Sequence, residues 1–239
     1  MGEDTRVIAV TGASRGIGAA IALELAGRGF TVGCLTRQGA GPQHERLIHL
    51  ACDVTDESSV RQALAMLAER GGGIAGLVNN AGIHLDGKSH ELATELYDQV
   101  MDTNARALFV VCREAYPYLA RNGGTIVNIG SFFDKLGVKR NLAYCASKAA
   151  VGAITRCLAV EWAPKKIRVL DVAPGYIETD LNVAAMQGPL RAFLEARVPT
   201  GGPGSVRDVA RLTAALFAED LPFLTGETIY LDGGQGMAH

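Results

Sequence analysis

Hydrophobic residues along the chain follow two alternating patterns: short continuous runs, and longer stretches in which apolar residues recur every three or four positions. The short runs predict seven β-strands, at residues 6–11, 30–35, 47–54, 76–79, 125–130, 167–173 and 228–232. The longer stretches predict helices at residues 16–29, 56–69, 91–119, 142–163 and 205–218. Asp56 and Ser205 stand where N-caps are expected, because their side-chain oxygens can accept from the free N–H groups of a first helical turn.

The order of these elements predicts the fold class. Strands alternate with helices, and apolar runs such as Ile-Val-Asn-Ile-Gly fit strands of a parallel sheet that is covered on both faces. We therefore expect an α/β protein with a single-domain, doubly wound Rossmann-type fold over residues 1–239, built on a seven-stranded parallel sheet. Residues 178–204 are the least regular stretch and contain three prolines, so we expect them to form a substrate lid.

Composition and charge restrict the function classes. Lys and Arg number 23 against 25 Asp and Glu, and the formal net charge of −2 gives no reason to expect a nucleic-acid partner. Neither a signal-peptide pattern nor an uncharged apolar run of about 18 residues is present, so we expect a cytoplasmic protein without a membrane partner. The five cysteines lack zinc-ligand spacing, which favours a reducing compartment and no metal site.

A glycine-rich loop follows the first predicted strand and opens the first predicted helix. Gly12, Gly16 and Gly18 are spaced G-x-x-x-G-x-G within Thr-Gly-Ala-Ser-Arg-Gly-Ile-Gly. Glycines let a backbone turn sharply and approach a pyrophosphate at a helix N-terminus. The residues expected to bind a dinucleotide here are Gly12, Ser14, Arg15, Gly16, Ile17 and Gly18. The alternative is a tight turn without a ligand.

The end of the second predicted strand indicates which dinucleotide is bound. An NAD site carries an acidic residue there for the ribose 2′-hydroxyl, but this chain has Leu-Thr-Arg, ending in Arg37. Arg15 in the glycine loop can approach the same place. Guanidinium groups suit a 2′-phosphate, so we expect NADP(H) rather than NAD(H). The alternative is that both arginines are solvated surface charges.

Tyr144 and Lys148 carry the candidate chemistry. Residues four apart on a helix share a face, so the two side chains project into the same space. An ordinary tyrosine pKa near 10 is too high for proton transfer at neutral pH, and a nearby ammonium group lowers the pKa of a phenol. Tyr144 can then act as general acid in carbonyl reduction or as general base in alcohol oxidation.

Further segments carry a family resemblance along nearly the whole chain. After the glycine loop come Asn-Asn-Ala-Gly at 79–82, Ser131, Tyr-Cys-Ala-Ser-Lys at 144–148, and Pro-Gly at 174–175. In this order and spacing, the chain resembles the short-chain dehydrogenase/reductase family. The segments TGASRGIG, YCASKA and APGYIETD are most similar to the 3-oxoacyl-(acyl-carrier-protein) reductase branch.

The resemblance implies roles for further residues. Ser131 would hydrogen-bond the substrate oxygen, Lys148 would also bind the nicotinamide ribose, and Asn104 would hold a water that links Lys148 to solvent as a proton relay. The further cofactor contacts it implies are Asp53, Val54, Asn80, Ala81, Gly82, Pro174, Gly175, Ile177 and Thr179. It also implies a homotetramer, formed through helices 91–119 and 142–163 and through the last helix and strand.

Three functions stay open at this point. The first is reduction of a 3-oxoacyl thioester, with Arg121, Lys165 and Lys166 as candidates for docking an acidic acyl carrier protein. The second is oxidation or reduction of another small carbonyl or alcohol, such as a sugar, polyol, steroid or xenobiotic ketone. Phe132 and Phe133 favour it if they face the substrate pocket, because they are bulky there; the alternative is that they pack in the core. The third is a dinucleotide-binding sensor without turnover.

Three other residues receive no catalytic role. His84 is expected at the pocket rim or on the surface, and Cys145 is expected to point away from Tyr144 along the helix. Asp171 is expected to be structural, and a buried carboxylate there would need a partner.

Overall fold

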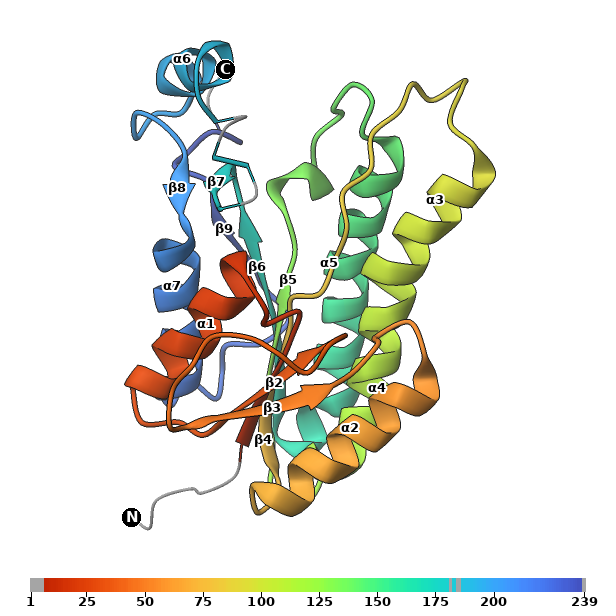
Figure 1. Ribbon diagram of the computed structural model, residues 1–239, viewed down its shortest axis with the longest axis vertical. Helices are drawn as coiled ribbons and strands as arrows, with labels where there is room; N and C mark the ends of the chain where they lie inside the picture. Colours follow the sequence, from red (N-terminus) through yellow and green to blue (C-terminus); the bar gives the residue numbers. More distant parts are fainter. Residues whose placement is uncertain (1–6, 181, 184–185, 238–239) are drawn as a thin grey trace.

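A computed structural model describes residues 7–180, 182–183 and 186–237. Its main feature is a parallel sheet in the order β3-β2-β1-β4-β5-β6-β9 (Figure 1). Its strands are β1 (Val7–Thr11), β2 (Val32–Thr36), β3 (Leu47–Ala51), β4 (Ile74–Asn79), β5 (Gly124–Ile129), β6 (Ile167–Pro174) and β9 (Thr228–Leu231). The predicted α/β class and seven-stranded parallel sheet are thus confirmed. Arg6, the first residue of the first predicted strand, lies outside the described residues.

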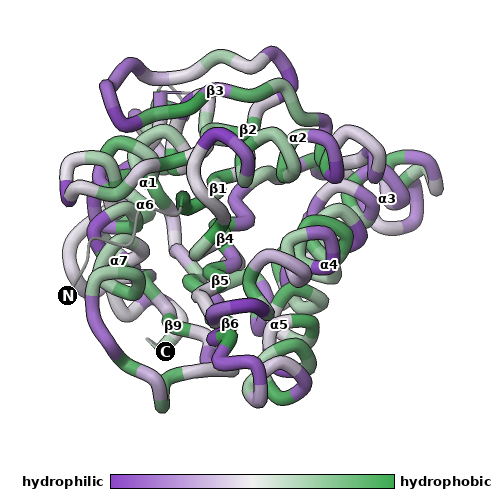
Figure 2. The backbone as a smooth tube through the Cα atoms, turned by 90° about the horizontal axis from the view of Figure 1, so that it is seen from below, coloured by the Kyte–Doolittle hydropathy of each residue, from purple (hydrophilic) through white to green (hydrophobic). Residues whose placement is uncertain are grey.

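Helices cover both faces of the sheet. α1 (Gly16–Gly27) and α7 (Val206–Ala218) lie on one face, and α2 (Glu57–Arg70), α4 (Ala107–Leu119) and α5 (Leu142–Trp162) lie on the other (Figures 1 and 2). Side chains alternate along each strand, so β1 supplies Val7 and Ala9 to one core and Ile8 and Val10 to the other. This double burial explains why the strands are continuous apolar runs.

The strand order reverses next to β1. β1 pairs with β2 on one side and with β4 on the other, because the chain runs outward to β3 and then crosses back. In doubly wound folds the loops at the carboxyl ends of such neighbouring strands diverge and leave a crevice. Here those loops are the glycine loop after β1 and the Asn-Asn-Ala-Gly segment that ends β4.

The prediction of one regular helix at 91–119 was wrong in two respects: the helix starts later, and it is interrupted by a π-helical segment. Glu91 belongs to a turn, since its N–H donates to the Lys88 carbonyl at 3.0 Å, and α3 (Thr94–Met101) begins only after it. The five residues of η1 (Asp102–Arg106) are π-helical and join α3 to α4. Such π-helical insertions are rare and occur often at functional sites. This one contains Asn104.

Residues 178–204 are more regular than expected. β7 (Ile177–Glu178) pairs in parallel with β8 (Gly204–Ser205), and α6 (Pro189–Arg197) lies between them. Pro189 occupies the first turn of α6, where its missing N–H costs nothing, so this proline starts a helix. Residues 181, 184 and 185 of this segment lie outside the described residues.

Other predicted boundaries agree to within three residues. Asp56 accepts from the N–H groups of Ser58 and Ser59, and Ser205 forms a reciprocal capping box with Asp208, which confirms both N-caps. The short 3-10 helices η2 (Phe132–Asp134) and η3 (Ala163–Lys165) flank α5. Within the part of the chain that the structure describes, no helix is long and apolar enough to cross a bilayer.

Candidate active site

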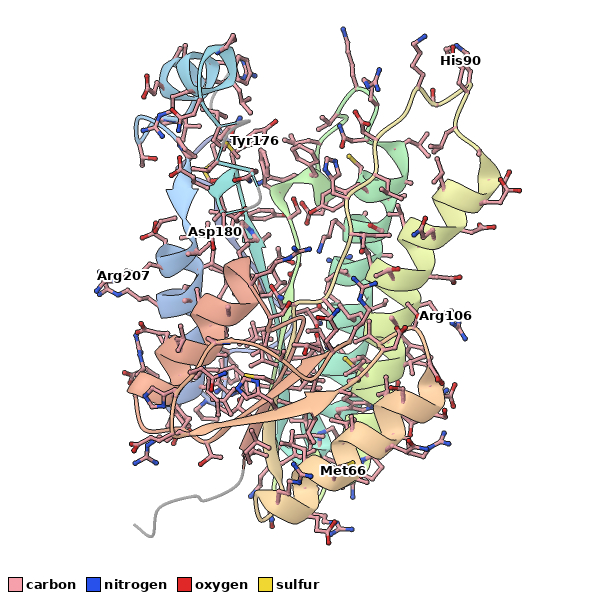
Figure 3. The ribbon with its side chains drawn as sticks, in the orientation of Figure 1. Met66, His90, Arg106, Tyr176, Asp180 and Arg207 are labelled. Atoms are coloured by element: carbon pink, nitrogen blue, oxygen red, sulfur yellow. The ribbon has the colours of Figure 1, made fainter. Side chains whose placement is uncertain are left out.

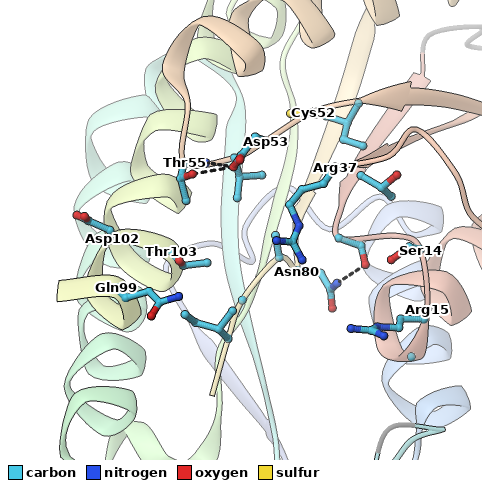
Figure 4. Close-up of a pocket in the computed structure, with 18 of the residues that line it drawn as sticks. Ser14, Arg15, Arg37, Cys52, Asp53, Thr55, Asn80, Gln99, Asp102 and Thr103 are labelled. Atoms are coloured by element: carbon cyan, nitrogen blue, oxygen red, sulfur yellow. Dashed lines mark hydrogen bonds between the residues drawn. The ribbon is translucent and has the colours of Figure 1, made fainter. Parts of the chain in front are cut away.

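A cleft of about 870 Å³ opens where the strand order reverses (Figure 4). It is lined by most of the residues expected to bind the dinucleotide: Gly12, Ser14, Arg15, Gly16, Ile17, Arg37, Asp53, Val54, Asn80, Ala81, Gly82 and Thr179. Thr55, Gln99, Asp102 and Thr103 also line it, although nothing in their local sequence indicated this. Thr55 comes from the loop after β3, and the other three come from α3 and η1. The position of these elements beside the cleft depends on tertiary packing.

Hydrogen bonds clamp the two loops that form the floor of the cleft. The Thr11 hydroxyl accepts from the N–H groups of Asn80 and Ala81 at 3.0 and 3.1 Å. In return, the Asn80 amide donates to the carbonyls of Thr11 and Gly12 at 3.1 and 3.2 Å. These bonds therefore fix the two loops relative to each other.

The glycine loop has the shape of a phosphate cradle. Gly12 has φ +65°, and a Cβ there would come within 2.9 Å of Ala81 Cα. A Cβ on Gly18 would collide with the Asn80 amide and the Gly12 carbonyl; Gly18 thus packs the loops together and does not line the cleft. Arg15, the N-cap of α1, makes no side-chain cap bond, and the first turn has no acidic residue. The N-terminus of α1 is therefore suited to an anionic group, and the residues fit a dinucleotide.

Arginine side chains approach one end of the cleft. Figure 4 shows Arg37 reaching into the cleft from the end of β2, with Arg15 nearby on the glycine loop. Asp53 is turned toward Thr55, whose hydroxyl and N–H donate to its carboxylate at 2.7 and 2.9 Å. These bonds, with the neighbouring Arg37 charge, lower the pKa of Asp53. No acidic side chain stands at the end of β2, where Leu35 and Thr36 are followed by Arg37.

A second cavity, of about 340 Å³, adjoins the cleft and shares Ile17, Asn80 and Thr179 with it. Ser131, Tyr144 and Lys148 line this cavity together, as do Pro174, Gly175 and Ile177. Ser131 caps η2, and its hydroxyl accepts from the Phe133 N–H at 3.3 Å. Lys148 is 7% exposed and donates to the Ile129 carbonyl at 2.7 Å, with its Nζ 5.6 Å from the Tyr144 ring centre.

Asn104 lies behind this cavity and does not line it. Its amide oxygen accepts from the Ile83 N–H at 2.8 Å, and its nitrogen donates to the Ile83 carbonyl at 2.9 Å and to the Ser147 hydroxyl at 3.1 Å. The π-helical turn thus fixes the loop after β4 against α5, one residue before Lys148. Both polar atoms of the Asn104 side chain are already engaged within the protein.

Aromatic rings form the wall of the second cavity. Phe133 lies 6.0 Å from the rings of both Tyr144 and Tyr176, and Phe132 lies 5.5 Å from Tyr176. Figure 3 shows Tyr176 just below the segment that carries α6. The ring of His84 packs edge-on against Tyr144 at 4.7 Å, and His84 also bonds Asn141. The bulky residues noted after Ser131 are therefore part of the pocket, and His84 is a rim residue.

Asn182 and Met186 complete the cavity from the segment 178–204. The Asn182 amide donates to the Ile177 carbonyl at 2.9 Å and accepts from the Thr179 N–H at 2.7 Å. Both polar atoms of its side chain are engaged within the protein, so Asn182 presents little free polarity to the cavity. Neither residue was predicted, because the stretch has no spacing pattern from which its contacts follow.

Comparison with known proteins identifies the family. A family model described as enoyl-(acyl carrier protein) reductase matches residues 12–235. The chain is 35% identical to the 3-oxoacyl-(acyl-carrier-protein) reductase FabG of Vibrio cholerae, over 99% of this chain and 100% of the relative. The chain belongs to the short-chain dehydrogenase/reductase family. It is therefore a member of an enzyme family of oxidoreductases.

The relatives that match this chain carry the names of different enzymes. Glucose 1-dehydrogenase of Gluconobacter oxydans is 34% identical, over 95% of this chain and 90% of that protein. A short-chain type dehydrogenase/reductase from Mycobacterium marinum is 32% identical and superposes with a TM-score of 0.86, over 96% of this chain and 95% of that one. Family members bind nicotinamide dinucleotides, in agreement with the cleft. Within the described residues, no three His, Cys, Asp or Glu side chains cluster as metal ligands.

Proposed function

We propose that this protein is an NADP(H)-dependent oxidoreductase that reduces a ketone to a secondary alcohol, with Tyr144 as the general acid. The observation that carries the proposal is the convergence of Ser131, Tyr144 and Lys148 in one cavity that adjoins the dinucleotide cleft. Thr179 lines both spaces, and Pro174, Gly175 and Ile177 line the cavity; these residues would hold the nicotinamide end. The bound nicotinamide supplies or accepts the hydride.

The side chains of the cavity handle the proton and the developing charge. The Ser131 hydroxyl orients the substrate carbonyl and hydrogen-bonds its oxygen as negative charge develops there. Tyr144 donates its phenolic proton to that oxygen. The Lys148 ammonium, held in place by the Ile129 carbonyl, stabilises the phenolate that remains. Because the Asn104 side chain is occupied, its relay role would use the main chain of the π-helical turn.

Preference for NADP(H) rests on the arginines at the ribose end of the cleft. Arg37 and Arg15 supply planar donors for a 2′-phosphate, whereas the end of β2 offers no carboxylate to a 2′-hydroxyl. Free cysteine thiols, three of them buried, are consistent with the reducing cytoplasm in which we place the reaction.

A 3-oxoacyl thioester is the first candidate substrate. It is supported by the relatives named 3-oxoacyl-(acyl-carrier-protein) reductase and by the apolar side chains Phe132, Phe133 and Met186 that line the cavity together with Ser131. The proposed docking role of Lys165 and Lys166 is not supported by their place in the fold. They precede β6, at the opposite end of the strand from the cavity, and Arg121 likewise precedes β5. A carrier protein would have to dock through other residues, so we favour a free thioester such as a coenzyme A ester.

The aromatic wall favours a second candidate, a compact apolar ketone. Phe132, Phe133 and Tyr176 surround the space next to Ser131, and the Asn182 amide is turned away from it. The two phenylalanine rings offer no hydrogen-bond partner to a sugar or polyol hydroxyl on that side of the cavity, and a buried hydroxyl without a partner is costly. Among the small carbonyls considered above, the cavity therefore favours an apolar ketone over a sugar.

We also propose a homotetramer that uses the outer surface of α4 and α5. Val160 is 81% exposed, and Phe109 and Leu142 on the same helices are exposed as well. The apolar residues Val151, Leu158 and Trp162 are instead buried in the core of the subunit. Sedimentation velocity should give the mass of four chains; a monomer across micromolar concentrations would contradict this assembly.

The experiment that tests the proposed chemistry compares the wild type with Tyr144→Phe. Initial rates of acetoacetyl-thioester and phenyl-ketone reduction would be followed as loss of NADPH absorbance, and NADPH binding would be measured separately by fluorescence. We expect reduction of at least one carbonyl class by the wild type, and a loss of at least about 100-fold in Tyr144→Phe with binding retained. Equal rates in the two proteins would rule out Tyr144 as the acid.

A further inference from the structure

Ser131 is the N-cap of η2, a 3-10 helix of only three residues. Its hydroxyl accepts from the Phe133 N–H at 3.3 Å, and its carbonyl accepts from the Asp134 N–H at 3.0 Å. The first of these bonds leaves the hydroxyl proton free to be donated to a substrate oxygen. So short a helix is not stable by itself, because few bonds offset the ordering of its backbone angles. The position of Ser131 therefore depends on what holds η2 from outside.

The side chain of Asp134, at the far end of η2, supplies a link of this kind. Its Oδ2 accepts from the Tyr230 hydroxyl of β9 at 2.8 Å, across 96 positions of the sequence. Its Oδ1 is buried and has no hydrogen-bond partner among the described residues. Tyr230 is thus the donor that holds this carboxylate, and the bond ties η2 to the edge strand of the sheet.

Tyr230 is in turn fixed on β9 by its surroundings. Two residues before it, Thr228 donates to the buried Asp171 of β6 at 3.2 Å, which adds a side-chain bond to the pairing of the two strands. The Lys135 ammonium lies 3.4 Å from the centre of the Tyr230 ring, within the range of a cation–π contact. Burial and the bond to Asp134 raise the pKa of the Tyr230 hydroxyl, so it remains a donor at neutral pH.

We infer that Tyr230 and Asp134 are positioning residues that fix η2 and thereby hold the Ser131 hydroxyl where it meets the substrate oxygen. This inference rests on the role proposed for Ser131. Ser131 and Phe133 line the cavity, whereas Tyr230 and Asp134 do not, so the pair acts through the turn and not on the substrate. Displacement of an orienting group by about 1 Å can lower a rate by about 100-fold, so a link behind the serine matters for turnover.

Amide hydrogen exchange, measured by NMR without substrate or cofactor, tests whether the link holds the turn. Tyr230→Phe keeps the ring against Lys135 and removes only the hydroxyl. In this variant we expect the Phe133 and Asp134 N–H groups, which donate to Ser131, to exchange at least about tenfold faster. The Val127 N–H, in the core of β5, reports global unfolding and should not change.

The matched control for this exchange measurement is Tyr118→Phe. It removes the hydroxyl of a half-buried tyrosine on α4 and should leave the exchange of the η2 amides unchanged. Asp134→Asn is the conservative variant, because its amide oxygen can still accept from Tyr230. We expect it to keep the slow exchange of the Phe133 N–H, whereas Asp134→Ala should lose it.

Reduction of acetoacetyl thioester then tests whether the link acts through the serine. Tyr230→Phe and Asp134→Ala should each lower kcat by about tenfold, with the affinity for NADPH unchanged. Asp134→Asn should keep most of the rate. When Ser131→Ala is already present, adding Tyr230→Phe should lower kcat by less than about twofold, because the group that the link positions is gone.

Each measurement has an outcome that would overturn the inference. One is exchange of the Phe133 and Asp134 amides in Tyr230→Phe within about twofold of the wild type. Another is an equal loss of kcat from Tyr230→Phe with and without the Ser131 hydroxyl, because that pattern belongs to a general defect. If the wild type reduced no carbonyl, the proposed function would fail, and the exchange rates would still decide whether Tyr230 and Asp134 hold the turn.

Discussion

The side chain of Asn104 holds both polar main-chain groups of Ile83, at 2.8 Å to its nitrogen and 2.9 Å to its oxygen. Asn104 is 1% exposed, so these bonds are shielded from water. The link joins the π-helical turn between α3 and α4 to the loop that follows β4. That loop lines both the cleft and the cavity, and its position therefore depends on a residue that touches neither.

Replacing Asn104 with Asp should damage stability and turnover together. The carboxylate cannot donate, so the Ile83 carbonyl and Ser147 each lose a partner, and a charge is buried. We expect the free energy of unfolding to fall by about 2 kcal/mol or more, as measured by urea denaturation at pH 7.5. Turnover should fall more than NADPH affinity. Asn122→Asp, on the exposed loop after α4, is the matched control. If Asn104→Asp lost no more stability and turnover than this control, the hydrogen bonds between Asn104 and Ile83 would contribute to neither.

Replacing Arg37 should weaken the binding of NADPH but not that of NADH. A charge-assisted bond to a 2′-phosphate contributes about 1.5–3 kcal/mol, so Arg37→Ala should weaken NADPH binding by roughly 10- to 100-fold. NADH lacks the phosphate, and its affinity should hardly change. Fluorescence titration of both cofactors measures this, with Arg46→Ala as the control. Equal weakening for NADH and NADPH would show that Arg37 acts on something other than the phosphate.

Much of the site was predictable because it depends on local spacing. The Gly12–Gly18 loop lies between a strand and a helix, and Tyr144 and Lys148 are one helical turn apart, so their placement follows from backbone geometry alone. Both N-caps were predictable for the same reason. The parallel sheet, covered by helices on both faces, followed from the alternation of buried strands and helices.

Other features depend on contacts between distant segments. α3 begins at Thr94 because a turn ends at Glu91, and the π-helical turn forms where Asn104 reaches Ile83. The helix α6 and the contributions of Tyr176 and Asn182 arise in a stretch without periodicity. Asp171 was expected to need a partner, but its place beside Gly130 became clear only from the sheet register.

Phe133 should limit the size of the group beside the substrate carbonyl. Its ring faces both Tyr144 and Tyr176, so Phe133→Leu should open the cavity at little cost in stability. Two additional buried methylenes contribute about 1.6 kcal/mol, so the kcat/KM ratio of a six-carbon over a four-carbon 3-oxoacyl thioester should rise by roughly tenfold. Phe217→Leu, on α7, is the control. An unchanged ratio would remove Phe133 from the determinants of specificity.

Asp171 should make stability depend on pH in a defined window. Its carboxyl has a pKa of about 6 in the folded chain against 3.8 ordinarily, so the native state holds a proton that the unfolded chain has released. The resulting stabilisation is present below pH 3.8 and is lost as the pH rises through 6. Two pKa units correspond to about 3 kcal/mol.

The amide of Asp171→Asn does not titrate. The stability of this variant relative to the wild type should therefore rise as the pH is raised from 4.5 to 7.5. Urea denaturation at several pH values in this range measures the difference between the two proteins. Glu227→Gln, at an exposed carboxylate directly before β9, is the matched control. A difference that stays constant with pH would mean that Asp171 has no raised pKa in the folded chain.

Parallel initial rates with the two cofactors test whether the protein reduces a carbonyl at the expense of NADPH. Purified wild-type protein would be given acetoacetyl thioester with NADPH or NADH at equal concentration, and loss of cofactor absorbance would be followed. We expect turnover that is at least about tenfold faster with NADPH than with NADH at subsaturating cofactor. Equal or faster turnover with NADH would contradict the role assigned to Arg15 and Arg37. No turnover with thioesters or apolar ketones, in protein shown to bind NADPH, would contradict the proposed reaction.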